Sequence, residues 1–116
     1  MIHYILVPVS DSPRLVNLSE PSDLLSEWYK LLGCDIVEHV STRYRYESIA
    51  LHMLVDEEGL LRNKEVNEVA SYLYGDTIVG DALICSVGPD DIEGLPSDIC
   101  VPVLSFLNKL YMALSS

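Results

Sequence analysis

Apolar residues recur along the chain in two rhythms, one typical of strands and one typical of helices. Residues 1–9 are apolar on both faces of a two-residue period, which predicts a strand near the centre of a sheet. Turn-forming residues precede a short returning strand at 14–18. Residues 24–32 then place four leucines and a tryptophan on one helical face, and Ser19 or Ser22 is expected to cap this helix.

The rest of the pattern predicts three further strands and two helices. The strands are expected at 35–46, 49–55 and 77–87, and the helices at 67–74, with Asn67 as cap, and at 101–114, after a loop at 88–97. The resulting order β(β)–α–β–β–α–β–α is typical of an α+β fold. We expect one domain over residues 1–116, with a mixed or antiparallel sheet and the helices packed on one side.

The most distinctive stretch lies within residues 55–83 and contains VDEEGLL, then VN, A, LYG and IVGDAL. Here a strand ends at Asp56, the chain turns, and Leu60 and Leu61 are expected to enter the core. The stretch resembles a family of uncharacterised small proteins, a domain of unknown function found in bacteriophages, conjugative elements and their bacterial hosts. Family members have proline after the capping asparagine, where this chain has Glu68. The resemblance implies an accessory protein of a mobile element in a bacterial cytoplasm, and no activity.

Charge narrows the range of functions. Eighteen acidic residues against seven basic ones give a net charge of −11, whereas proteins that bind nucleic acid usually have a basic surface. We therefore expect no nucleic-acid partner. The acidic charge either only keeps the protein soluble or favours a protein partner with a basic surface. The apolar stretch at 2–9 is too short to span a membrane and lacks the features of a signal peptide. The expected location is the cytoplasm, away from membranes.

Cysteines and histidines indicate no metal site or cofactor. Cys34, Cys85 and Cys100 are widely spaced and form no C-x-x-C pair, so buried reduced thiols are expected. His39 and His52 lie on predicted neighbouring strands, where they can face each other, but two imidazoles alone make a poor zinc site. No phosphate-binding loop or nucleophile motif occurs, so no catalytic residue is assigned and an enzyme is disfavoured.

Six residues form a candidate ligand-binding set: Arg43, Tyr44, Arg45, Asn67, Tyr74 and Asp81. Alternating arginine and tyrosine can grip a nucleotide through stacking and charge, although pairing with acidic neighbours across the sheet explains the same pattern. Asp81 would be buried if its strand were regular, which would make it a pocket residue. A bulge at Gly80 would instead turn it outward.

Two functions remain open. The first is a non-catalytic protein-interaction module, and the alternative is a protein that binds or sequesters a small, nucleotide-like ligand. A pocket that brings the arginines and tyrosines together would favour the ligand, and a continuous acidic face would favour a protein inhibitor. The helix at 101–114 is apolar around most of its circumference, which predicts a homodimer through this helix.

Overall fold

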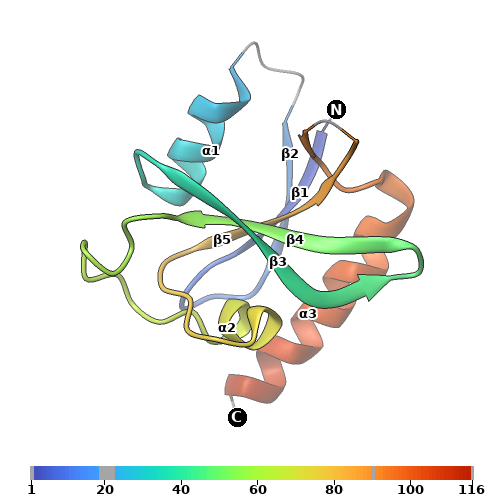
Figure 1. Ribbon diagram of the computed structural model, residues 1–116. Coiled ribbons are helices and arrows are strands. Elements are labelled where there is room, and N and C mark those ends of the chain that lie inside the picture. The colour runs from blue at the N-terminus through green and yellow to red at the C-terminus, as the bar shows by residue number, and fades with distance from the viewer. Residues whose placement is uncertain (1, 19–22, 90, 116) are drawn as a thin grey trace.

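The computed structural model describes residues 2–18, 23–89 and 91–115, which form an antiparallel sheet of six strands with three helices (Figure 1). The predicted α+β class is therefore confirmed. The elements in chain order are β1 (Ile2–Val7), β2 (Arg14–Leu18), α1 (Leu24–Leu32), β3 (Val37–Tyr46), β4 (Ile49–Asp56), α2 (Glu68–Tyr74), β5 (Ala82–Val87), β6 (Ile92–Glu93) and, after one 3-10 turn at Ser97–Ile99, α3 (Cys100–Ser115).

The strands follow the order β2-β1-β5-β4-β3, and β6 pairs with the end of β5. β1 lies between β2 and β5, as its apolar character on both faces predicts. All described pairings are antiparallel. The short strand β6 lies in the stretch that the sequence indicated as a loop.

Helices cover both faces of the sheet, so the prediction that they pack on one side is wrong. Ile5 and Val7 of β1 belong to the core that α2 and α3 complete. Tyr4 and Leu6 point the other way, into a second core with Trp28 of α1. The physical reason is the apolar character of β1, β4 and β5 on both faces, since each face must be shielded from water.

Two predicted boundaries change. The strand expected at 77–87 begins only at Ala82, because Gly80 takes a left-handed φ of 81° that breaks the extended backbone. Val79 makes only an isolated bridge, to Val66. The described cap of α1 is Asp23, whose carboxylate accepts the N–H of Ser26 at 3.1 Å; the predicted caps Ser19 and Ser22 lie outside the described residues.

Asn67 is a fully buried polar residue and caps α2 as predicted. Its side-chain oxygen accepts the N–H of Ala70 at 3.0 Å. Its amide nitrogen donates to the carbonyls of Val7 and Gly80, both at 2.9 Å. One side chain therefore joins the start of α2, the end of β1 and the turn before β5.

The stretch Ser97–Ser115 has the length, 19 residues, and the mean hydropathy, 1.2, of a membrane-spanning helix. In the fold, Val103 and Leu107 are buried in the core beneath the sheet, although only 22% of the stretch is buried. A core helix of a soluble protein has the same length and composition, so this similarity is weak evidence. That the protein keeps away from membranes stays a prediction.

We predict that Asn67→Ala destabilises the protein by about 3 kcal/mol or more. The substitution leaves two buried carbonyls and one helix N–H without their partner, and each such group costs roughly 1–3 kcal/mol. Urea unfolding measures the change. Asn17→Ala is the control, because Asn17 is exposed on β2 and bonds only to the ring of His3 among the described contacts; its cost should stay within ~0.5 kcal/mol. Equal losses in the two variants would contradict the structural role of Asn67.

Candidate functional site

The end of β3 contains a β-bulge at the arginine–tyrosine stretch that the sequence indicated. The register between β3 and β4 shifts within residues 41–45. The hydroxyl of Thr42 donates to the carbonyl of Leu51 at 2.7 Å and accepts the N–H of Tyr44 at 3.1 Å. Because these bonds hold the irregular backbone, Tyr44 has a defined position over the face covered by α2 and α3.

Three aromatic rings from three elements meet there. The ring of Tyr44 lies 6.1 Å from that of Tyr72 on α2, at an interplanar angle of 24°. It lies 5.7 Å from the ring of Phe106 on α3, at 42°. Tyr72 is 46% exposed and Phe106 is 39% exposed, so the cluster faces solvent.

Beside this cluster lies a hollow of about 300 Å³, which we call the aromatic groove. It runs between the end of the β3–β4 hairpin and the first turns of α3. Its walls are mostly apolar, and none of its lining residues is histidine, cysteine, aspartate or glutamate. The lining residues are Tyr44, Arg45, Tyr46, Leu51, Pro102, Val103 and Phe106.

Two arginines lie near the aromatic cluster, each fixed by one hydrogen bond to the backbone. Arg45 lines the groove, whereas Arg43 lines a separate hollow beside α2. Arg43 donates to the carbonyl of Tyr72, in the last turn of α2, at 2.8 Å, where a cation is favoured by the helix dipole. Its guanidinium carbon lies 6.0 Å from the ring centre of Tyr44. Arg45 donates to the carbonyl of Ser48 at 2.9 Å. A guanidinium has five N–H donors, so each arginine can also bind a ligand.

Hydrogen bonding keeps the phenol at the centre of the cluster neutral. The bond with the Tyr72 side chain raises the pKa of Tyr44, and partial burial and the neighbouring phenol raise it further, against the smaller effect of Arg43. Tyr44 is therefore an uncharged hydroxyl at physiological pH. It can stack on a ligand and hydrogen-bond to it, but it is not a base.

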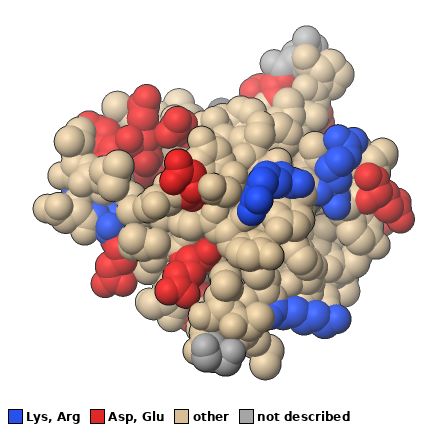
Figure 2. Space-filling model, turned by 60° about the horizontal axis from the view of Figure 1, so that its bottom comes forward, with Lys and Arg blue, Asp and Glu red and all other residues tan. Residues whose placement is uncertain are grey.

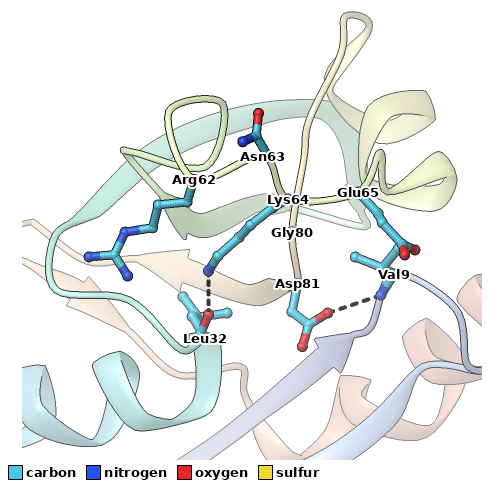
Figure 3. Close-up of a pocket in the computed structure, with 8 residues that line it drawn as sticks. All are labelled: Val9, Leu32, Arg62, Asn63, Lys64, Glu65, Gly80 and Asp81. Carbon is cyan, nitrogen blue, oxygen red and sulfur yellow. Dashed lines mark hydrogen bonds between the residues drawn. The ribbon is translucent and has the colours of Figure 1, made fainter.

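A second hollow, of about 350 Å³, lies at the other end of β4 and contains Lys64 (Figure 3). The ammonium group of Lys64 is saturated: it donates to the carbonyls of Leu32 and Gly33 at 3.0 and 2.9 Å and lies 2.8 Å from a carboxylate oxygen of Asp56. Three acceptors match the three donors of an ammonium group. The lining residues are Val9, Leu32, Arg62, Asn63, Lys64, Glu65, Gly80 and Asp81.

The remaining cation of this hollow is also paired. Arg62 lies 2.5 Å from Asp35 and 3.8 Å from Glu58. The Asp56 side chain is only 1% exposed. Burial acts to raise its pKa, but the hydrogen bonds from Lys64 and from the N–H of Glu58, with the two nearby cations, outweigh burial and lower the pKa. The two cations of this hollow are therefore paired with carboxylates of the protein itself, which makes the hollow a poor site for an anion.

The six candidate residues lie in different parts of the fold. Tyr44 and Arg45 line the aromatic groove, Arg43 lies against the ring of Tyr44 from outside the groove, and Asn67 is a buried structural residue. Asp81 is half-buried, and its carboxylate accepts the N–H of Val9 at 3.0 Å (Figure 3). This is the outward orientation of the side chain that a bulge at Gly80 would cause.

Tyr74 lies at the exposed end of α2, outside the groove. Sequence reasoning missed Tyr72 and Pro102 at the site. Phe106 was visible only as part of an apolar helix, because no sequence spacing predicts which side of α3 meets β3.

The histidines and cysteines lie as the sequence predicts. Nε2 of His39 is 2.8 Å from Nδ1 of His52, and burial, together with the neighbouring imidazole, lowers the pKa of His52. All three cysteines are buried and free, and burial raises the pKa of Cys85 to about 12. Among the described residues no three metal-ligating side chains gather.

Residues 2–108 match the family model of a domain of unknown function, DUF3846. The match spans most of the chain, so the chain belongs to this family. No curated protein and no solved structure gives a match.

We predict that Lys64→Met destabilises the protein by ~3 kcal/mol at neutral pH, because it leaves the buried Asp56 carboxylate without a cation. The lowered pKa of Asp56 means that its contribution is present above the ordinary pKa of about 4 and is lost as pH falls through the lower folded value. The stability gap between wild type and variant should therefore narrow below pH ~4.

The matched control is Lys30→Met, whose lysine is 72% exposed and 3.7 Å from Glu27 on α1. An exposed pair contributes little, so this variant should unfold almost as the wild type does at every pH. Urea unfolding at a series of pH values measures both. A gap for Lys64→Met that is independent of pH would contradict the role of Asp56.

Proposed function

We propose that this DUF3846 protein is a non-catalytic interaction module that holds a short segment of a partner protein in its aromatic groove. The proposal rests on one observation, the meeting of Tyr44, Tyr72 and Phe106 beside two arginines. Tyrosine and arginine are the residue types that dominate binding energy at protein interfaces. Phenols, guanidinium groups and apolar walls bind well but provide no nucleophile or base.

The size and surroundings of the groove favour a protein segment. A hollow of about 300 Å³ is at the small end of small-molecule sites, which have roughly 300–1,000 Å³, and it suits one large anchoring side chain. Elsewhere on α3 further apolar side chains are exposed, since Val101 is 73% exposed and Met112 is 69% exposed. Exposed apolar surface of this kind is typical of a docking face.

Local charge indicates the chemistry of the segment. Arg45 lines the groove, Arg43 lies against the ring of Tyr44 from outside it, and Lys109 follows Phe106 by three residues on α3, so three of the seven basic residues of the chain are in this region. Acidic residues lie in separate groups on the face drawn in Figure 2 and form no continuous acidic surface there. The partner segment should therefore pair a large apolar anchor with aspartate or glutamate.

The context of the proposal is an accessory protein of a mobile element in the bacterial cytoplasm. Its support is the resemblance of residues 55–83 to small phage and conjugative-element proteins.

Selection from a displayed random-peptide library tests the function. We expect enriched peptides to contain a large apolar residue next to acidic ones. Phe106→Ala and Tyr44→Ala should each weaken peptide binding about thirtyfold, the equivalent of ~2 kcal/mol for a hot-spot residue. Calorimetry with the best peptide measures this.

The control is Leu25→Ala, which removes a 44% exposed leucine from α1 on the other face of the sheet. It should bind the peptide as the wild type does. Peptides that bind Phe106→Ala at full strength, or a selection that enriches none, would overturn the proposal.

The second candidate is an anion with a flat ring, such as a nucleotide. It is favoured by a groove that brings Arg45 together with Tyr44 and Tyr46, and by the lack of a continuous acidic surface on the face drawn in Figure 2. A ligand that binds only the folded state stabilises it by about 2.7 kcal/mol at a hundredfold excess over Kd. A thermal-shift screen of nucleotides should then show a rise in Tm that Arg45→Ala abolishes. A flat screen with a successful peptide selection would assign the groove to a protein segment alone.

A further inference from the structure

The loop between β4 and α2 exposes two adjacent leucines. Leu60 is 76% exposed and Leu61 is 81% exposed, which makes the expectation that they enter the core wrong. We call residues 57–63 the dileucine loop. The cause of the exposure is visible at Gly59, which is buried against Val79: a Cβ on Gly59 would lie 2.7 Å from a methyl group of Val79. The backbone of the loop therefore occupies the space that the leucine side chains were expected to fill.

The leucines are exposed on a loop whose backbone is held. The N–H of Lys64 donates to the carbonyl of Gly59 at 3.1 Å, and the N–H of Arg62 donates to that of Glu58 at 3.0 Å. The Asp56 carboxylate accepts the N–H of Glu58 at 2.9 Å. Because the loop is already ordered, a partner that receives the leucines does not bear the entropy cost of ordering it.

Acidic residues surround the apolar tip. Glu57 and Glu58 precede the leucines, and the N–H of Glu57 donates to the carbonyl of Ile36, which is itself 43% exposed and follows Asp35. Asp35 and Glu58 are paired with Arg62 of the same loop, so the dileucine loop is an apolar anchor with the carboxylate of Glu57 beside it. This is the chemistry that the aromatic groove, with its apolar walls and Arg45, would take.

We propose that the dileucine loop of one copy of this chain docks into the aromatic groove of a second copy. The inference rests on the proposed function of the groove and names its partner. Charge complementarity supports it, because Glu57 lies next to the exposed leucines and Arg45 lines the groove.

One copy cannot fill its own groove. The loop follows Asp56 at one end of β4, and the groove lies beside Leu51 near the other end, past which the hairpin turns (Figure 1). A strand of this length spans about 25 Å. The contact therefore joins two copies, the loop of one to the groove of the other. A reciprocal exchange closes a symmetric pair, and a one-way exchange builds chains or rings.

Two variants, each with one surface damaged, test the inference. Leu60→Asp/Leu61→Asp damages the loop and Phe106→Ala damages the groove; all three side chains are exposed, so the fold should persist, and urea unfolding verifies this. Sedimentation at 0.15 M salt, where the Debye length is about 8 Å, limits repulsion between acidic copies. We expect the wild type to associate with rising concentration, and each variant alone to remain monomeric.

Mixing the two variants is the decisive step. The loop variant retains a groove and the groove variant retains a loop, so the mixture should form a 1:1 complex of twice the monomer mass and nothing larger. Leu25→Asp, an exposed leucine on α1, is the matched control and should associate as the wild type does.

Monomeric wild type, a mixture that stays monomeric, or variants that associate on their own would each overturn the inference. Its failure is distinguishable from failure of the proposed function. If the groove binds selected peptides while the mixture of variants stays monomeric, the proposed interaction module is retained and its partner is a different protein. Loss of both peptide binding and association would remove both proposals.

Discussion

The arrangement of the fold depends on the buried amide of Asn67. Its donors hold the end of β1 and the turn before β5, and its acceptor holds the start of α2. No apolar residue could replace it, because the two carbonyls and one N–H would then be buried without partners. A buried polar group that is fully bonded fixes one arrangement of its neighbours, since alternatives leave it unpaired. Here it fixes where α2 crosses the sheet.

The position of α2 determines the groove. Arg43 reaches the last turn of α2 at Tyr72, and Tyr44 stacks on the same tyrosine. The bulge in β3, held by Thr42, brings both residues to that place. The groove is therefore built from a strand irregularity and a helix that is fixed from its far end, with Phe106 of α3 closing it. These are rigid supports, which is what a preformed binding surface needs.

The sequence predicts the elements well and the site only in part. Period-two and period-3.6 patterns report which faces are apolar, so β1, α1 and the cap at Asn67 follow directly from them. They do not report which layer a helix joins, and α1 packs opposite the other two helices. Leu60 and Leu61 were misplaced for a related reason: apolarity predicts burial, but the close approach of Gly59 to Val79 occupies the space they would need. Such an approach depends on contacts between distant segments and leaves no periodic signal.

The net charge of −11 does not describe the local charge around an individual site. At one end of β4 the cations Arg62 and Lys64 are paired with Asp35, Glu58 and Asp56, and Glu57 lies next to the exposed leucines. At the other end Arg45 donates to a single carbonyl and lines an apolar hollow. The same few basic residues are therefore structural at one end and available at the other. Because screening limits charge effects to about 8 Å in physiological salt, any contact at either end depends on these local differences more than on the net charge of the whole molecule.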